Sequence, residues 1–218
     1  MHPPWSMIFF TTLAGAAQGL LLALVGIELG ATVGVIAPAR SWQPLQASPI
    51  ALKADITGAA IVLLFGAIGL VAATFHLGHP LRAWRSAAMW RTSWLSREII
   101  VLPAFLACVA LWSTMHWLGG TTLGWGLAAA MLALLLYLCT GMIYAAVKAI
   151  REWATPLTPW NYMLLGIASG LMLCTALAAA LAPAYAADLA LAALVAMLVG
   201  GVSRALTLWR NLTLPPMT

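Results

Sequence analysis

The sequence predicts an all-α fold, a polytopic bundle of helices that crosses a membrane several times. Hydrophobic residues make up 64% of the chain and charged residues only 7%, whereas a soluble domain carries roughly 25% charged residues. Several uninterrupted apolar runs reach the roughly 20 residues that a helix needs to cross about 30 Å of hydrocarbon. Because these runs are continuous rather than alternating, they do not fit the strands of a membrane β-barrel.

Six apolar segments are long enough to be spans, and together they predict a single integral membrane domain over residues 1–218. They cover about residues 7–36, 54–75, 98–118, 123–150, 162–181 and 187–208. Helix-breaking residues separate them, since Pro38 follows the first segment and Pro183 ends the fifth. No lysine or arginine precedes Arg40, and the first apolar run is too long for a signal-peptide core, so we expect no cleaved signal.

Basic residues are distributed unevenly between the two ends of the predicted spans. If the N-terminus is cytoplasmic, that side receives eight of the ten lysines and arginines: Arg82, Arg85, Arg91, Arg97, Lys148, Arg151, Arg204 and Arg210. The other side receives only Arg40 and Lys53. The positive-inside rule therefore predicts that both termini are cytoplasmic. An arginine cluster that docks a partner protein would produce the same bias.

Tryptophans and small residues fit a compact membrane bundle. Ten of the eleven tryptophans fall near predicted span ends, which is typical of an aromatic belt. Small residues are dense in the spans, for example Gly15 and Gly19, then Gly166 and Gly170. Because each pair is four residues apart, it lies on one face of a helix and lets a neighbouring helix approach closely.

Neither the net charge nor the cysteines indicate a nucleic-acid or metal site. The net charge is +5, but no basic run or basic–aromatic groove lies outside the loops, so we expect no nucleic-acid partner. The three cysteines, Cys108, Cys139 and Cys174, lie far apart inside apolar runs. They lack the spacing of an iron–sulfur cluster or zinc site, and we expect small buried side chains.

One polar loop between the second and third spans is the candidate working surface. Residues 74–99 contain two of the four histidines, four arginines and three tryptophans. The arginines can bind lipid phosphates, follow the positive-inside rule, or pair with an acidic protein surface. His76, at the end of the second span, can hydrogen-bond a quinone carbonyl and move a proton near neutral pH, or simply cap the helix. Glu98 either stabilises the start of the third helix or exchanges protons with a quinone near His76.

Two further acids and the remaining histidines could carry other chemistry. Glu28 is the one acid well inside a predicted span, where an ionisable residue is functional or paired within the bundle. Asp55 opens the second span, and we expect it to act as a helix cap. His76 and His116 lie at opposite ends of their spans, about 25–30 Å apart, so they do not form a bis-histidine haem site. No pair of interrupted spans with midplane charge indicates a transporter.

Two motifs in the polar loop resemble the membrane-anchor subunit of the dimethyl sulfoxide reductase family. The segment HLGHPLRAW over residues 76–84 resembles the family pattern HLG-x-P-x-RA-[FW], and SWLSRE over residues 93–98 resembles S-x-LS-x-E. Residues 144–172, with TPW at 158–160, are also similar to the later part of the family. The similarity extends over most of the chain, and its specific part comprises about 25 residues.

The resemblance implies a non-catalytic subunit of a three-part oxidoreductase complex. The expected partners are a molybdopterin catalytic subunit and a ferredoxin-like subunit with four iron–sulfur clusters, while the anchor holds no haem and no cluster of its own. It would bind a quinone, ubiquinone or menaquinone, near the interface and pass electrons to it. The family's quinone-linked histidine and glutamate fall on His76 and Glu98, and the matching arginine is Arg82. The residues expected to dock the partner are Arg85, Arg91, Trp94 and Arg97.

Two departures from the family bear on the direction of electron flow. Family members often have eight spans, whereas this sequence predicts six. In respiratory reductases this loop faces the periplasm, but the charge distribution places it in the cytoplasm. That orientation, and the opening MHPPWSMIFFTT, resemble the anchor of cytoplasm-facing sulfite dehydrogenase complexes of the bacterial inner membrane. We therefore expect electrons to run from sulfite to quinone.

Two alternatives stay open. The first is a quinol-oxidising anchor of a sulfoxide, tetrathionate or polysulfide reductase, which has the same fold and the opposite electron flow. The second is a transporter or a scaffold with lipid in the cleft.

Overall fold

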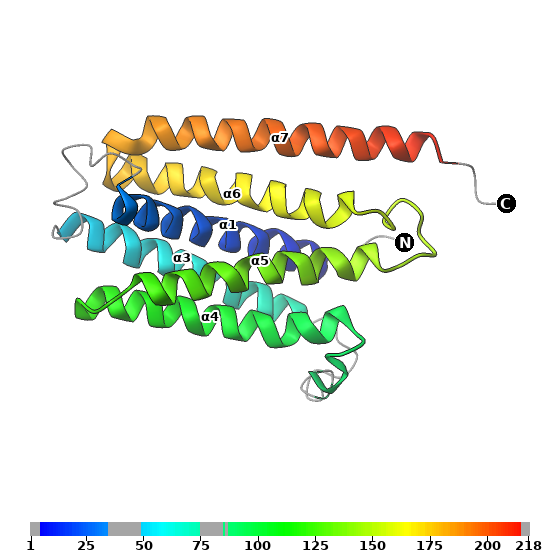
Figure 1. Cartoon of the computed structure of the whole chain (residues 1–218), viewed down its shortest axis with the longest axis horizontal. Helices are drawn as coiled ribbons and strands as arrows, with labels where there is room; N and C mark the ends of the chain where they lie inside the picture. Colours follow the sequence, from blue (N-terminus) through cyan, green and yellow to red (C-terminus); the bar gives the residue numbers. More distant parts are fainter. Residues whose placement is uncertain (1–4, 35–48, 75–84, 86, 215–218) are drawn as a thin grey trace.

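The computed structural model describes residues 5–34, 49–74, 85 and 87–214 (Figure 1). This part of the chain is helical and contains no β-strand. Its long helices are α1 (Trp5–Val33), α3 (Pro49–Thr74), α4 (Trp94–Leu118), α5 (Leu123–Ala145), α6 (Leu157–Leu181) and α7 (Ala186–Leu212), with a short 3-10 helix, η2 (Pro183–Tyr185), before α7. Six segments are long and apolar enough to cross a membrane, which confirms the predicted fold class and makes the protein a multi-pass membrane protein.

The ends of the helices differ from the predicted spans by a few residues. Helix α4 begins at Trp94, four residues earlier than expected, because Ser93 caps it: the Ser93 Oγ accepts a hydrogen bond from the Ser96 N–H at 3.3 Å. Helix α4 ends where predicted, at Leu118. The next residue, Gly119, has a φ of 69°, in the left-handed region that glycine adopts without strain. Helix α5 ends at Ala145, five residues early, because residues 146–156 form turns instead.

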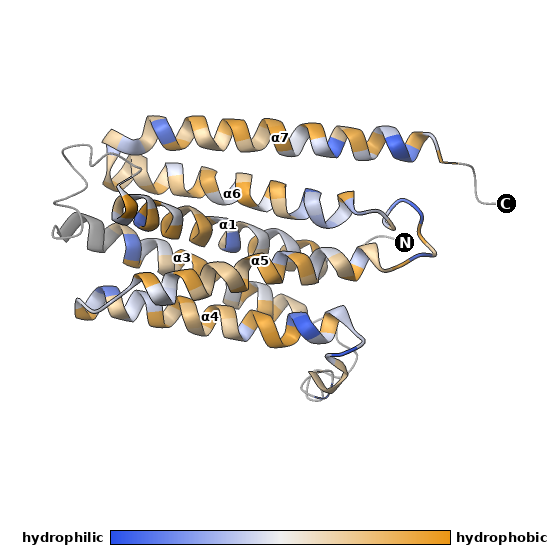
Figure 2. Ribbon diagram, in the orientation of Figure 1, coloured by the Kyte–Doolittle hydropathy of each residue, from blue (hydrophilic) through white to orange (hydrophobic). Residues whose placement is uncertain are grey.

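The helices lie side by side with α1 in the middle of the bundle (Figure 1). Helix α1 contacts α3, α5 and α6, α4 packs against α3 and α5, and α7 packs against α6. The start of α1, the end of α7 and the turn at residues 87–93 share one end of the bundle, which we call the arginine end. The opposite end, with the α4–α5 turn at residues 119–122, is the far end. Figure 2 shows hydrophobic residues along the full length of the helices, as a lipid-facing bundle requires.

Helices α1 and α6 meet through glycine, as the small-residue spacing predicts. A Cβ atom added to Gly19 would lie 2.2 Å from the Gly166 carbonyl oxygen, and one added to Gly170 would lie 2.0 Å from the Gly19 carbonyl carbon. The two backbones are therefore in direct contact, and no larger side chain fits between them. Helix α7 is joined to α6 by polar groups: Asn161 donates to Thr207 at 2.7 Å and accepts from Ser203 at 2.6 Å.

Among the described tryptophans, seven are exposed, Trp94 is half-buried and Trp112 is buried. The exposed group lies near helix ends, as an aromatic belt requires, and comprises Trp5, Trp90, Trp117, Trp125, Trp153, Trp160 and Trp209. Trp112, the tryptophan that lies away from the predicted span ends, is fully buried in the core between α4 and its neighbours. A buried indole N–H needs a hydrogen-bond acceptor, and in this bundle the acceptor is Glu28 of α1.

Candidate functional site

Glu98 is the described member of the predicted quinone site, and it is buried at the arginine end of the bundle. Its side chain is 4% exposed. The carboxylate accepts a hydrogen bond from the Thr140 hydroxyl of α5, and Thr140 is itself 2% exposed. The expected capping role for Glu98 is wrong, because Ser93 fills that position and Glu98 lies beyond the first turn of α4. His76 and Arg82, the other two predicted quinone-site residues, lie outside the described residues.

Glu98 has no counter-charge within the described ranges. The ion pairs found there involve other residues, all at the far end. Its sequence neighbour Arg97 points away from it, toward the loop, where it bonds two backbone carbonyls. A buried carboxyl group without a cation is costly in an apolar surrounding unless hydrogen bonds hold it. Such a group at the arginine end can take up and release protons, whereas one fixed in a salt bridge stays ionised.

Other polar side chains extend from Glu98 into the centre of the bundle. Tyr144 and Tyr162 lie close enough to Glu98 to interact with it electrostatically. The Tyr162 hydroxyl donates to the Thr11 carbonyl of α1 at 3.0 Å, and the Tyr162 ring packs edge to face against Tyr137, with ring centroids 5.5 Å apart. Helices α1, α4, α5 and α6 therefore all place polar groups near this carboxyl.

Gln18 lies deeper in the bundle and is fully buried. Its amide donates to the Ala14 carbonyl at 3.0 Å, while its Oε1 atom has no hydrogen-bond partner in the described part of the chain. A buried acceptor without a donor is uncommon in native proteins. No motif or charge pattern in the sequence marks Gln18, so only the packing of the helices reveals it.

Arg97 holds the turn that precedes α4. Its Nε donates to the Trp90 carbonyl at 2.9 Å and its Nη2 to the Arg91 carbonyl at 3.0 Å. The guanidinium also lies 4.2 Å from the centre of the Trp94 ring. Arg85 and Arg91 are exposed at the same end. The structure thus brings Arg91, Trp94 and Arg97 together in one cluster, in which Arg97 orders the loop.

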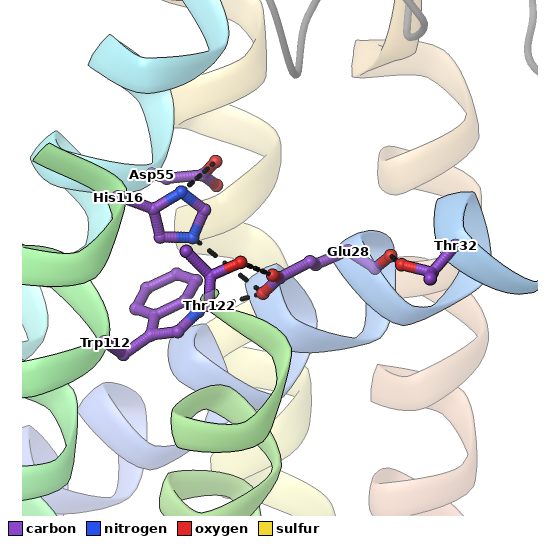
Figure 3. A network of polar contacts seen from close by, with 6 residues as sticks. All are labelled: Glu28, Thr32, Asp55, Trp112, His116 and Thr122. Atoms are coloured by element: carbon purple, nitrogen blue, oxygen red, sulfur yellow. Dashed lines mark hydrogen bonds and ion pairs between the residues drawn. The ribbon is translucent and has the colours of Figure 1, made fainter. Parts of the chain in front are cut away.

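The far end carries a polar group that joins three helices (Figure 3). The two oxygens of Glu28, from α1, accept hydrogen bonds from Trp112 of α4 at 2.9 Å and from the Thr122 hydroxyl. His116 stands between two carboxylates: its Nε2 lies 3.8 Å from Glu28 and its Nδ1 lies 3.7 Å from Asp55 of α3. Neither separation is short enough for a hydrogen bond, and each contact becomes an ion pair only when the imidazole is protonated.

Asp55 does not cap its helix. Helix α3 begins at Pro49, so Asp55 lies in the second turn and turns inward toward His116. The pairing of Glu28 within the bundle is one of the two outcomes expected for it. The pairing with His116 was not predicted. In the ranges that the structure describes, no three His, Cys, Asp or Glu side chains are arranged to hold a metal ion.

Comparison with known proteins identifies the family to which this sequence is similar. The model of the DMSO reductase anchor subunit matches residues 1–217. The sequence is 43% identical, over 97% of its length, to a sulfite dehydrogenase subunit of Allochromatium vinosum, of which it covers 66%. It is 29% identical, over 54% of its length, to a subunit of the anaerobic dimethyl sulfoxide reductase of Haemophilus influenzae, of which it covers 43%. It therefore spans less than two thirds of either relative. No solved structure matches. The family match extends along the whole bundle, and the protein belongs to the DMSO reductase anchor subunit family.

Proposed function

We propose that this membrane anchor binds a quinone at the arginine end and passes electrons to it from an iron–sulfur partner subunit. The observation that carries the proposal is Glu98, a buried carboxyl without a counter-charge in the described residues, placed where the family motif begins α4. A bound quinone supplies the acceptor for two electrons and two protons. Glu98 is suited to exchange protons with it because its hydrogen-bond partner among the described residues is a neutral hydroxyl and not a cation.

His76 and Arg82 are proposed to complete the site. Both belong to the HLGHPLRAW motif that links α3 to the arginine end. A histidine donates to a carbonyl oxygen and titrates close to neutral pH, so His76 would share the proton exchange with Glu98. Arg82 would hold a carbonyl oxygen or order the loop through its fixed fork of donors.

The partner subunit is proposed to dock on the arginine end. Arg85 and Arg91 are exposed there, and Arg97 and Trp94 fix the turn that presents them. A positively charged surface of this kind favours an acidic partner such as a ferredoxin-like subunit, and a molybdopterin subunit would complete the complex. Because exposed charges are screened by salt, this docking should weaken as ionic strength rises.

Sulfite is the proposed electron source. One relative is named as a sulfite dehydrogenase subunit, and the positive-inside rule predicts a cytoplasmic arginine end. Both favour oxidation on the cytoplasmic side of the bacterial inner membrane. The other relative is named as part of a dimethyl sulfoxide reductase, which supports a second candidate, quinol oxidation that feeds a reductase.

The test is to purify the tagged protein from membranes in mild detergent and to measure molybdenum, iron and sulfite-dependent reduction of decylubiquinone. We expect both metals and the activity to co-purify with it. Metals without sulfite activity would favour the reductase candidate. An anchor free of metal, or a His76→Ala complex with undiminished electron flow, would contradict the quinone-site proposal and favour a scaffold or transporter.

A further inference from the structure

Thr140 makes a contact of a different kind from the usual hydrogen bond of a threonine in these helices. Five helical threonines donate back to the carbonyl four residues earlier in their own helix: Thr11, Thr32, Thr114, Thr175 and Thr207. That local bond is the ordinary choice of a threonine in a helix. The Thr140 hydroxyl instead crosses from α5 to α4 and donates to Glu98 Oε1.

The contact is enclosed on both sides. Thr140 is 2% exposed and Glu98 is 4% exposed, so water does not compete for either group. Helix α5 is fixed at this depth because the next residue, Gly141, touches α6: a Cβ atom on Gly141 would lie 2.5 Å from the Cα of Pro159. The backbone that carries Thr140 is therefore packed tightly against α6, one residue away from the contact with α4.

A hydroxyl is chemically matched to a carboxyl that changes its protonation state. The ionised carboxylate only accepts hydrogen bonds, whereas the protonated acid also has an O–H to donate. A threonine hydroxyl has one hydrogen to give and lone pairs to accept, so it can partner both forms by rotating about its C–O bond. Lysine or arginine has no acceptor and would favour the ionised form alone.

From this geometry we infer that Thr140 is a positioning residue for proton exchange at Glu98. It holds Oε1 in one place through both protonation states, so that the carboxyl returns to the same geometry after each proton leaves and the next arrives. The inference rests on the proposed function, because it needs Glu98 to exchange protons during quinone reduction. It goes beyond the family motif, because Thr140 lies on α5, outside the HLGHPLRAW and SWLSRE segments.

The experiment compares variants of the whole complex with decylubiquinone as acceptor and sulfite as donor. Ferricyanide, which takes electrons without a quinone site, serves as the control acceptor. Thr140→Val keeps the shape of the side chain and removes the hydroxyl. We expect it to lower kcat for decylubiquinone about 10-fold and to leave KM within about 2-fold. Thr140→Ser keeps the hydroxyl and should restore kcat to within about 3-fold of the original. Thr175→Val, the same change at a back-bonded threonine, should have no effect.

A double-mutant cycle separates this inference from the proposal on which it rests. Glu98→Gln should lower kcat about 100-fold, and adding Thr140→Val to it should change nothing further, because the two residues act through one contact. If Glu98→Gln were fully active, the proposed role of Glu98 would fall. If Glu98→Gln lowered kcat but Thr140→Val left it at the original value, only the inference about Thr140 would be overturned. The same would follow if the kcat of Thr140→Ser were as low as that of Thr140→Val.

Discussion

At the scale of single residues, two glutamates inside the bundle, one half-buried and one buried, have different partners. Glu28, at the far end, receives hydrogen bonds from Trp112 and Thr122 and an ion pair from His116. Glu98, at the arginine end, receives one hydroxyl within the described residues. The first arrangement joins helices, and the second is the one for which we propose proton exchange. The chemistry is therefore proposed for Glu98, while mutations at Glu28 should act on stability.

We expect the Trp112 indole to stabilise the fold through its N–H group as well as through packing. Trp112→Phe keeps an aromatic ring in the core but removes the donor that lies 2.9 Å from Glu28. Hydrogen bonds to charged groups contribute roughly 1.5–3 kcal/mol, so we expect a loss of about 2 kcal/mol and a lower unfolding midpoint in detergent. Trp117→Phe, at a side chain that is 72% exposed, is the matched control and should leave the midpoint unchanged. Equal midpoints for both variants would contradict the role given to the N–H.

We expect His116 to stabilise the two carboxylates at the far end, Glu28 and Asp55. Removing one partner of an ion pair in an apolar surrounding leaves an uncompensated charge, and at these half-buried side chains the loss is smaller than for a fully buried pair. His116→Gln should therefore lower the unfolding midpoint. Adding Glu28→Gln should recover part of the loss, because the unpaired carboxylate is then gone. Additive losses in the double variant would mean that the two side chains are not coupled.

At the scale of the elements, the contact between α1 and α6 sets the centre of the bundle. These helices touch backbone to backbone at Gly19 and Gly170. Tyr137 of α5 and Tyr162 of α6 donate hydrogen bonds to carbonyl groups of α1. The site at the arginine end thus depends on how closely two glycine faces approach. A helix pair held apart by even one methyl group would displace Tyr162 from its hydrogen bond with Thr11.

Gly170→Ala should be poorly tolerated for this reason. The added methyl carbon would lie 2.0 Å from the backbone of α1, which cannot yield as a flexible side chain could. Overpacking of this kind costs about 1–3 kcal/mol or more, so we expect a lower yield and a lower unfolding midpoint. Gly201→Ala, on the open face of α7 where nothing lies within 4 Å, should be neutral or slightly stabilising. A Gly170→Ala protein as stable as the Gly201→Ala protein would contradict the close approach.

At the scale of the whole molecule, the even number of described spans puts the start of α1, the end of α7 and the arginine turn at one end. The fold was predictable because long apolar runs bounded by proline and glycine leave little choice in a membrane. Glu98 was also predictable, since a motif marks it. The roles of Thr140 and of the His116–Glu28 pair could not be predicted. Contacts between helices depend on how each helix is rotated and how deep it lies, which a single sequence does not specify.

The orientation of the bundle can be measured with single cysteines. Ala88→Cys lies at the arginine end and Thr121→Cys at the far end, and both positions are exposed. If the positive-inside prediction is right, a membrane-impermeant maleimide added to intact cells will label residue 121 and not residue 88. The unmodified protein, whose Cys139 and Cys174 are buried and whose Cys108 is half-buried, gives the background. The reverse pattern would place the arginine end outside and favour the reductase candidate.

The central place of α1 also has a consequence for the order of assembly. Helix α1 is the first of the described spans to be synthesised and the most enclosed in the finished bundle, while α6, which covers its glycine face, is the fifth of the six. The glycine face of α1 at Gly19 is therefore without its partner until α6 arrives. A nascent polypeptide that stops after α5 has an incomplete contact surface on its central helix.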